Sequence, residues 1–320
     1  MSLAFVFPGQ GSQSIGMLAD FQASSVAAVD LPEVAVRVIK DTFQQASDAI
    51  QFDLWELAQT GPDVELSRTE NTQPALLAAS VGLFRAWLAA GGAMPVLLAG
   101  HSLGEYSALV CSDAMTLEDA TRLVRLRGQL MQAAVPLGAG AMAAVLGGDL
   151  ALIEQACIDG AEGEIIEPAN LNAPGQIVIS GHASALDRTL KLLAERGVRK
   201  SIRLPVSVPS HCALMREAAA KLGTALGDIE LQAPKIALLH NVSAARCSTP
   251  EAIRAALVAQ LYSRVRWIES VQGLASLGAT RVLECGPGKA LSGMIKRIAP
   301  ELAVAGLATA AEFNAALSSQ

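Results

Sequence analysis

Aromatic side chains are scarce in this chain: Phe, Trp and Tyr together make up 4% of its 320 residues. Charged residues are also few, at 17%, whereas 52% of the residues are hydrophobic. So apolar a chain buries a large core, which excludes disorder as the default state. Because Ala and Leu abound where aromatics are missing, the composition favours helices packed on a sheet over an all-β sandwich.

An excess of positive charge is missing as well. The net charge of −6 gives no basic face for nucleic acid. The most apolar region, Ala75–Gly100, is interrupted by Arg85 and Pro95 and cannot supply the ~20 apolar residues of a spanning helix. Met1–Pro8 has no basic segment of the kind that opens a signal peptide. We therefore expect a cytoplasmic protein with neither nucleic acid nor membrane as a partner.

Metal and cofactor signatures are absent from the sequence. The five cysteines are an odd number without metal-type spacing, which favours reduced thiols. No G-x-G-x-x-G lies between a strand and a helix, and Gly286–Lys289 lacks the spacing of a phosphate-binding P-loop. The sequence predicts an activity that uses no metal and no cofactor.

Short apolar runs alternate with longer helical stretches along most of the chain. The runs that predict strands of a largely parallel sheet are Leu3–Phe7, Pro95–Gly100, Ile236–His240 and Arg281–Cys285. Helical patterns lie between them, for example at Gln73–Ala90, Thr116–Ala134 and Ala252–Leu261. This alternation predicts an α/β fold with a largely parallel sheet.

The middle of the chain has a different pattern. Ala141–Leu146, Gln176–Ser180 and Lys200–Val206 read as strands separated by helices near 150–158 and 183–196. A β-α-β-α-β run of this length predicts a smaller α+β insert. We expect a large domain from 1–137 and 208–320 and a small domain from 138–207. Ala23–Val34 fits neither part and is interpreted as a surface excursion.

Gly100–Gly104 matches G-x-S-x-G with Ser102 at its centre, directly after a predicted strand and before a predicted helix. In a nucleophile elbow a sharp turn presents the serine, and flanking glycines avoid clashes in that turn. The following helix points its positive dipole end at the reaction centre. The amide of Leu103 can then donate to an oxyanion. The alternative is a serine that merely closes a turn.

A serine nucleophile needs a base, and the chain has four histidines: His101, His182, His211 and His240. His101 precedes the serine on the elbow, and His240 ends a strand, where a structural role fits it. His211 follows the rigid turn Val208–Ser210 ahead of a helix, a boundary position from which an imidazole can enter a cleft. The pattern favours His211 only modestly: it is about as good a candidate as the other three histidines together.

Arg127 falls on the apolar stripe of the helix that begins near Thr116. A guanidinium directed at the core needs an anionic partner, because an unpaired buried charge is strongly unfavourable. Either Arg127 extends outward or meets a structural carboxylate, or it receives the carboxylate of a substrate. Periodicity alone favours the first interpretation slightly. In the loop Pro8–Gln13, the amide of Gln10 is a candidate second oxyanion donor, against an ordinary turn.

These segments together resemble one family. Seven motifs occur in order: Phe5–Gln13, Asn71–Ala75, Gly100–Tyr106, Arg127–Gly128, Asn170–Gln176, Val206–His211 and Gly286–Lys289. The chain resembles the bacterial malonyl-CoA:acyl carrier protein transacylases of type II fatty acid synthesis over nearly its whole length. That resemblance implies a hydrolase-like α/β domain with a ferredoxin-like insert.

The resemblance also implies roles for single residues. Ser102 would be the nucleophile, His211 the general base, and the backbone carbonyl of Gln260 would orient His211. The amides of Gln10 and Leu103 would form the oxyanion hole. The substrate-binding residues would be Arg127, which grips the malonyl carboxylate, together with Asn170 and His101.

The implied activity is ping-pong transfer of a malonyl group from malonyl-CoA to a holo acyl carrier protein. A malonyl transferase of malonate decarboxylase or of a polyketide pathway is the nearest alternative; a thioester hydrolase and a non-catalytic carrier-binding module are the others. We expect an acidic carrier to dock on a basic patch drawn from Lys289, Lys296, Arg297, Arg264 and Arg266. Two departures from the family pattern are Leu31–Arg37, a longer stretch, and Arg264, where a proline is usual.

Overall fold

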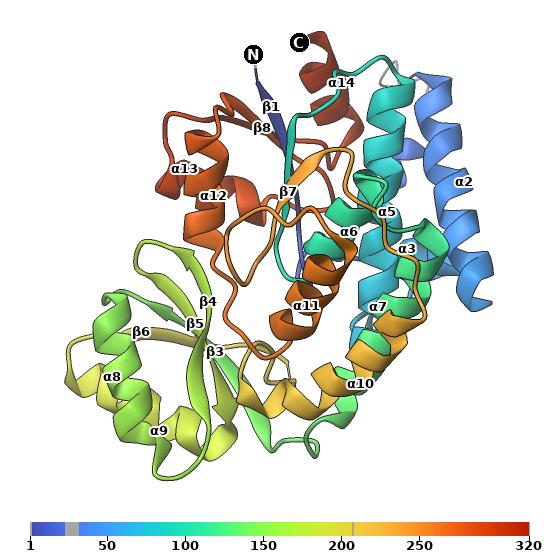
Figure 1. Cartoon of the computed structure of the whole chain (residues 1–320). Coiled ribbons are helices and arrows are strands. Elements are labelled where there is room, and N and C mark those ends of the chain that lie inside the picture. The colour runs from blue at the N-terminus through green and yellow to red at the C-terminus, as the bar shows by residue number, and fades with distance from the viewer. Residues whose placement is uncertain (1, 23–31, 207, 320) are drawn as a thin grey trace.

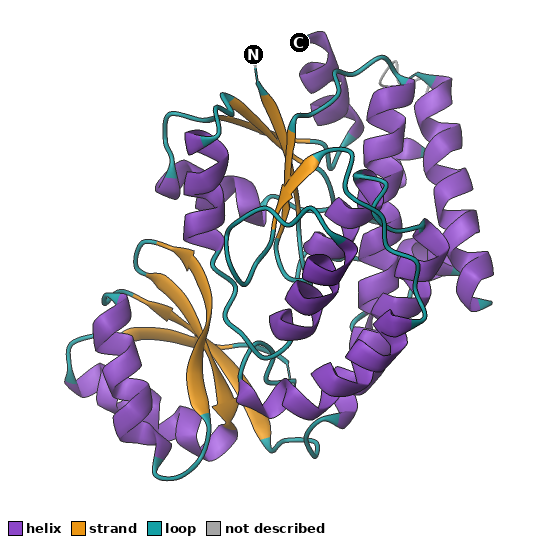
Figure 2. Cartoon of the chain, in the orientation of Figure 1, coloured by secondary structure: helices purple, strands orange, loops and turns teal. Residues whose placement is uncertain are grey.

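A computed structural model describes residues 2–22, 32–206 and 208–319. Two sheets organise it, and they lie in different parts of the molecule (Figures 1 and 2). One has five strands in the order β7-β2-β1-β8-β9, and the other has four in the order β4-β5-β3-β6.

The five-stranded sheet is parallel throughout. Its strands are β1 Leu3–Phe7, β2 Leu97–Gly100, β7 Ala237–Leu239, β8 Arg281–Glu284 and β9 Ala303–Gly306. β1 lies at the centre and pairs with β2 and β8 on its two sides. Every residue of β1 and β2 is buried, which explains why both read as unbroken apolar runs in the sequence.

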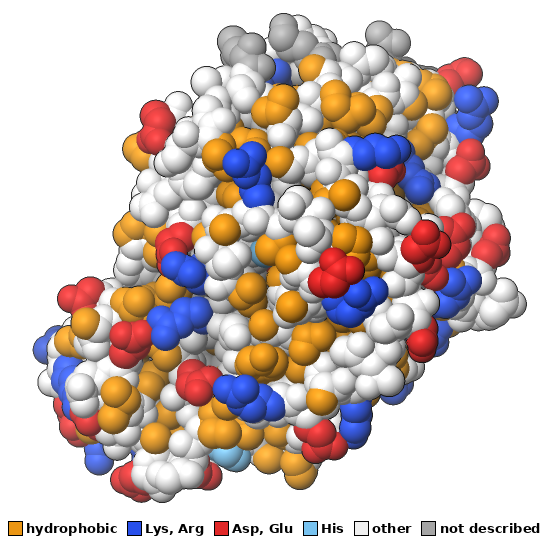
Figure 3. Space-filling model, viewed as in Figure 1, with side chains coloured by type: hydrophobic (Ala, Val, Ile, Leu, Met, Phe, Trp, Pro, Cys, Tyr) orange, Lys and Arg blue, Asp and Glu red, His pale blue; other side chains and the backbone are white. Residues whose placement is uncertain are grey.

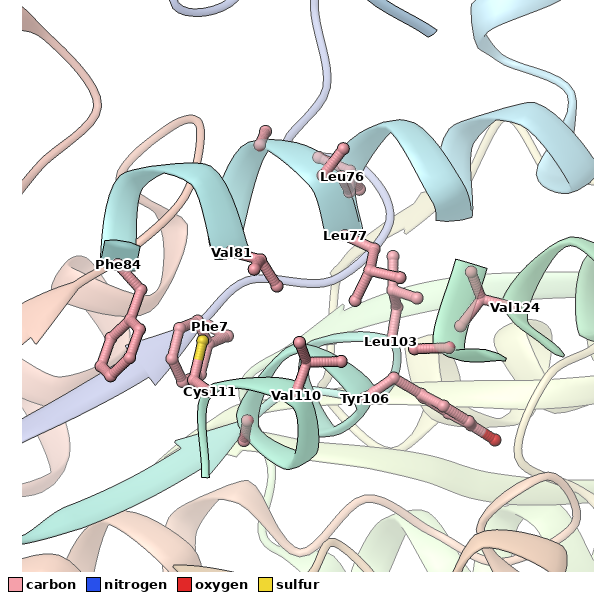
Figure 4. Packing of buried hydrophobic residues seen from close by; sticks show 14 of the residues in the cluster. Phe7, Leu76, Leu77, Val81, Phe84, Leu103, Tyr106, Val110, Cys111 and Val124 are labelled. Atoms are coloured by element: carbon pink, nitrogen blue, oxygen red, sulfur yellow. The ribbon is translucent and has the colours of Figure 1, made fainter. Parts of the chain in front are cut away.

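Helices cover both faces of this sheet. The helices of the large part of the chain are α2 Glu33–Ile50, α3 Leu54–Thr60, α4 Asp63–Leu66, α5 Thr69–Ala89, α6 Gly104–Cys111, α7 Leu117–Ala133, α10 Arg216–Gly227, α11 Pro250–Gln260, α12 Trp267–Ser276, α13 Ala290–Ile298 and α14 Ala310–Ser318. Short 3₁₀ turns add Ala19–Phe21 and Ala213–Met215. α5 and α6 pack on one face through a core that contains Phe7, Leu77 and Leu103 (Figure 4). α12 and α13 cover the other face through a smaller core.

The four-stranded sheet is antiparallel and carries its two helices on one face. Its elements follow as β3 Gly140–Leu146, α8 Leu150–Ala161, β4 Ile166–Ala173, β5 Gln176–His182, α9 Ala183–Glu195 and β6 Lys200–Arg203. This β-α-β-β-α-β order is that of a ferredoxin-like unit. The opposite face bears Met142 and Val178, with Leu204 packed beside them, and is turned towards the large part of the chain.

Most sequence-based expectations for the elements are confirmed, and three are wrong. The insert has four strands where three were expected, because β4 was missed. The expected strand Lys200–Val206 ends at Arg203, two residues before Pro205, which has no N–H to donate. β9 was not expected at all. The stretch Ala23–Val34 lies mostly outside the described residues, and its last two residues, Glu33 and Val34, begin α2.

Backbone and side-chain hydrogen bonds hold the small sheet against the large part. The backbones of Asn170 and Val265 form a parallel bridge, with Leu171 N donating to Val265 O (2.9 Å) and Val265 N donating to Ala169 O (2.8 Å). Arg297 on α13 donates to the Pro174 carbonyl and to Gln176 Oε1 in the β4–β5 turn. The strands of the small sheet all come from residues 140–203, and 138–207 stays our proposed extent of that domain.

Candidate active site

Ser102 lies on a sharp turn between β2 and α6. Its φ of 52° is left-handed, a conformation that non-glycine residues rarely adopt. The glycines of the motif are required by close packing: a Cβ on Gly100 would lie 1.9 Å from the Gly104 carbonyl carbon, and a Cβ on Gly104 would lie 2.0 Å from the Phe7 oxygen. The expected elbow is therefore present, with the serine at the N-terminal end of α6.

The side chain of His211 contacts Ser102, although the two residues are 109 positions apart in the sequence. Its Nε2 is 2.8 Å from Ser102 Oγ, and its Nδ1 is 2.8 Å from the backbone oxygen of Gln260. A carbonyl only accepts, so Nδ1 carries the proton and Nε2 is free to take the proton of the serine. The His211 φ of 63° is also left-handed, and its amide donates to Leu261 O (2.9 Å).

Burial, together with the positive charge of nearby Arg127, lowers the pKa of His211 from 6.5 to about 3. The imidazole is therefore neutral at physiological pH and can act as a base. Of the other histidines, His182 accepts from the amide of Ile165 (2.9 Å), and His240 contacts Glu105. Both are structural, as the sequence indicated for His240.

Arg127 is 1% exposed, and its guanidinium reaches the nucleophile. Nη2 donates to Ser102 Oγ (3.2 Å) and to Gln260 Oε1 (3.0 Å), and Nη1 donates to Gln73 Oε1 (2.8 Å). The Nε has no partner, and no carboxylate contacts the guanidinium among the described residues. Of the two sequence-based interpretations, the structural carboxylate is thus missing from the described part of the chain.

Two backbone amides near Ser102 have no protein acceptor in the described structure, those of Gln10 and Leu103. They are the two that the sequence proposed for an oxyanion hole. The amide of Ser102 itself is already used, because it donates to Asn241 Oδ1 (2.7 Å). The Leu103 amide at the start of α6 and the Gln10 amide in the loop after β1 are candidates to receive a developing negative charge.

A cavity of about 260 Å³ opens above Ser102. His101 and Asn170 line it, as expected for substrate-binding residues. His101 Nε2 is 2.8 Å from Asn172 Oδ1, and burial lowers the pKa of His101, which keeps its ring neutral. The Oδ1 of Asn170 is buried and has no hydrogen-bond partner among the residues that the structure describes. The face of the small sheet that is turned towards the large part of the chain supplies an apolar wall through Met142 and Val178.

Sequence reasoning missed three polar residues at this site. Asn241 holds the elbow by accepting from the Ser102 amide and donating to the Gly100 carbonyl. Gln73 accepts from Arg127, although the sequence marked it only as part of a motif. Glu105, in the same motif as Ser102, is fully buried and contacts Gln260. Each partner lies at least 54 residues away, so no local pattern could reveal these contacts.

The basic residues expected to dock a carrier are mostly engaged within the chain. Arg264 pairs with Glu154, Arg266 with Glu269, and Lys289 with Glu312. Arg297 holds the β4–β5 turn, which leaves Lys296 as the member without an ion-pair or hydrogen-bond partner in the described structure. Acidic and basic side chains are interspersed on the face seen in Figure 3.

Two further expectations concern metals and membranes. No three His, Cys, Asp or Glu side chains gather into a possible metal site within the described residues. In the same part of the chain, no helix combines the length and the apolar character needed to cross a bilayer. Cys212, beside the base, is buried, and burial raises the pKa of its thiol to about 11, which makes it unreactive.

A serine on a strand–helix elbow, a neutral imidazole and free amides together define an α/β enzyme that handles acyl groups. The family described as "Acyl transferase domain" matches residues 4–308. The chain belongs to this acyltransferase family.

Two relatives with named activities are similar to this chain over most of its length. The malonyl CoA-acyl carrier protein transacylase of Salmonella typhimurium is 49% identical over 316 residues, 98% of each chain. The transacylase of the same name from Bacillus subtilis is 41% identical over 92% of this chain and 90% of its own.

Two solved structures of malonyl transacylases are also similar to this chain. The malonyl-CoA:acyl carrier protein transacylase from Xanthomonas oryzae superposes with a TM-score of 0.94 at 53% identity, covering 100% of this chain and 99% of its own. A malonyl-transacylase in complex with its type II polyketide acyl-carrier protein gives 0.94 at 46% identity, covering 100% of both chains.

Proposed function

We propose that this enzyme transfers a malonyl group from malonyl-CoA to the phosphopantetheine thiol of an acyl carrier protein, through an ester on Ser102. The names of its relatives support the substrates. The single observation that carries the choice of acyl group is Arg127, a buried guanidinium that no carboxylate contacts in the described part of the chain and that lies 3.2 Å from Ser102 Oγ.

Acylation begins when Ser102 Oγ attacks the thioester carbon of malonyl-CoA. His211 Nε2 takes the serine proton, and the carbonyl of Gln260 stabilises the imidazolium through Nδ1–H. The tetrahedral oxyanion accepts from the amides of Gln10 and Leu103; one such donor contributes ~3 kcal/mol. Collapse breaks the carbon–sulfur bond, and His211 returns the proton to the departing CoA thiolate.

Transfer reverses these steps with a new thiol. The phosphopantetheine thiol of the carrier gives its proton to His211 and attacks the ester carbon. The same amides hold the second oxyanion, and the C–O bond to Ser102 breaks as Oγ regains a proton from the imidazolium. The product is malonyl-carrier, the enzyme is restored, and the cycle consumes no cofactor.

Arg127 explains why a malonyl group is preferred to an acetyl group. The malonyl carboxylate pairs with the guanidinium and occupies donors such as Nε that the protein leaves without a partner. An acetyl group excludes water from the cavity and leaves those donors unpaired, an arrangement that discriminates strongly between near-isosteres.

Intact-protein mass spectrometry tests the proposal. Wild type mixed briefly with malonyl-CoA should gain one malonyl adduct, and Ser102→Ala should gain none. Adding a holo carrier should remove the adduct and increase the carrier mass by one malonyl group. Rapid return to the free enzyme with no malonyl-carrier would identify a hydrolase, and carrier binding without any adduct would identify a binding module.

A polyketide role is the second candidate, because one similar structure is the malonyl-transacylase of a type II polyketide system. Transfer to a fatty-acid carrier and to a polyketide carrier, measured side by side, separates the two. A malonate decarboxylase subunit would instead transfer to the decarboxylase carrier.

We place the enzyme in the cytoplasm, where CoA thioesters are made, and all five cysteines are free thiols as that compartment requires. Its carrier would be acidic and would dock near the cavity mouth. Because Lys296 is not engaged within the described part of the chain, Lys296→Glu is the cleanest test of the basic patch. It should slow transfer to the carrier and leave formation of the malonyl adduct unchanged.

A further inference from the structure

Glu105 is a buried carboxylate that the reaction cycle does not use. It is 0% exposed and lies in the first turn of α6, three residues after the nucleophile. Its Oε2 accepts from Gln260 Nε2 (2.8 Å) and from the Asn241 amide (3.0 Å). Its Oε1 is 2.7 Å from His240 Nδ1, and no Lys or Arg contacts it within the described residues.

Gln260 connects this carboxylate to the substrate-binding arginine. Its side-chain Nε2 donates to Glu105, and its Oε1 accepts from Arg127 Nη2 (3.0 Å). A carboxylate only accepts and a guanidinium only donates, so the two charges allow one orientation of the amide between them. The reversed amide would place an NH₂ group against the guanidinium.

The same residue orients the base. The backbone oxygen of Gln260 accepts from His211 Nδ1, while its side chain bridges Glu105 and Arg127. Gln260 is therefore fixed at both ends, and one of its anchors is Glu105. Within the described residues, Arg127 donates to the side-chain amide oxygens of Gln73 and Gln260 and to Ser102 Oγ, and it lies over the ring of Tyr106. Loss of order in Gln260 therefore removes one of its two amide acceptors.

We propose that Glu105 is a positioning residue: through the side-chain amide of Gln260, it holds the Arg127 guanidinium where the acyl carboxylate binds. This inference rests on the proposed function, since it concerns how the malonyl carboxylate is recognised. It assigns the Gln260 side chain a role separate from that of its backbone carbonyl.

Neutral Glu105→Gln is the direct test. A glutamine has one oxygen for three donors, those of His240, Asn241 and Gln260, and it replaces a charged acceptor by a weaker neutral one. We expect the KM for malonyl-CoA to rise about tenfold and the malonyl-to-acetyl ratio of kcat/KM for adduct formation to fall about tenfold.

A second variant, Gln260→Leu, removes the amide bridge and keeps the backbone carbonyl that orients His211. It should also lower the malonyl-to-acetyl ratio. In the double variant Glu105→Gln/Gln260→Leu, the ratio should fall no further than in Gln260→Leu alone, because Glu105 acts through that side chain.

Glu284→Gln is the matched control. Glu284 is also fully buried, but it accepts from the amides of Leu291 and Ser292 and does not contact Arg127 or Gln260. Its variant should lose stability and keep the wild-type ratio. A purely structural role for Glu105 predicts that Glu105→Gln behaves in the same way.

The results of these experiments distinguish a failure of this inference from a failure of the proposed function. Wild type that forms no malonyl adduct overturns the proposed function. Wild type that prefers malonyl, with Glu105→Gln and Gln260→Leu keeping that preference, overturns the inference alone. Should Glu105→Gln fail to fold, Gln260→Leu decides: an unchanged ratio there also overturns it.

Discussion

Replacing Arg127 by Met removes the guanidinium while keeping an apolar side chain of similar length. In the wild type, the charge is 1% exposed and is held by two amide oxygens and the Ser102 hydroxyl. A malonyl carboxylate supplies the missing anion, and an acetyl group does not. The variant should therefore lose the distinction between the two substrates.

The magnitude follows from the burial of the charge. Leaving one member of a buried ion pair unpaired costs about 3–5 kcal/mol. At 1.4 kcal/mol for each factor of ten, the wild type should favour malonyl-CoA over acetyl-CoA by roughly 10²- to 10⁴-fold in kcat/KM. In Arg127→Met the malonyl carboxylate becomes the unpaired buried charge, so malonylation slows by a similar factor and the preference disappears.

Quenched-flow mixing followed by intact-protein mass spectrometry gives the rate of each adduct directly. Arg125→Met is the matched control, since Arg125 lies on the same helix but donates to the Ile50 carbonyl (3.0 Å) and packs over Phe52. It should keep the wild-type preference. If Arg127→Met still selects malonyl-CoA, the carboxylate is recognised elsewhere and the assignment of Arg127 is wrong.

Three further predictions concern the base, the elbow and its anchor. Burial and the charge of Arg127 lower the pKa of His211 to about 3, so kcat/KM for adduct formation should fall only below about pH 5 and not near pH 6.5. Arg127→Met should move this acidic limb of the pH profile to higher pH. A wild-type limb near pH 6.5 would contradict this reasoning. The depressed pKa also means that the contribution of His211 to stability is complete above about pH 6.5 and is lost as the pH falls towards the folded value. Gly104→Ala places a Cβ 2.0 Å from the Phe7 oxygen and should lower the melting temperature sharply. Gly293→Ala, in helix α13, places a Cβ with no described atom within 4 Å and should raise stability by about 0.5–1 kcal/mol. Equal effects of the two variants in thermal unfolding would refute the packing argument. Asn241→Leu leaves the Ser102 amide without its acceptor. It should lower the free energy of unfolding by about 1–3 kcal/mol in urea titrations and slow adduct formation. A variant with wild-type rate and stability would show that Asn241 does not hold the elbow.

The sequence predicted the parallel sheet well because its central strands are buried on both faces. β1 and β2 are uninterrupted apolar runs followed by glycine or proline signals, the pattern that such burial demands. β4 and β9 lack that pattern. β4 contains Pro168 and three polar positions and is interrupted by two register shifts, and β9 is a four-residue edge strand with only its last residue buried.

The residues of the candidate site also divide into those that the sequence could predict and those that it could not. Ser102, Leu103 and Gln10 could be placed from sequence because the elbow and its neighbouring loop are local structures. His211 and Arg127 were ambiguous from pattern alone, and the family resemblance, not periodicity, favoured their catalytic and substrate roles. Glu105 and Asn241 were missed because their contacts join α6 to segments more than 130 residues away. Nothing in a one-dimensional pattern distinguishes such buried polar residues from exposed ones.

The left-handed backbone at Ser102 and His211 implies that the conformation needed for the proposed chemistry lowers the stability of the fold. Both proposed catalytic residues hold a φ above 50°, where most side chains are strained by about 1 kcal/mol or more, asparagine is better tolerated and glycine is not strained. Laboratory evolution that rewards heat resistance alone is therefore expected to enrich glycine or asparagine at positions 102 and 211. Such a lineage would gain stability by losing the proposed nucleophile and the proposed base, so a screen for stable variants of this fold must select for turnover at the same time.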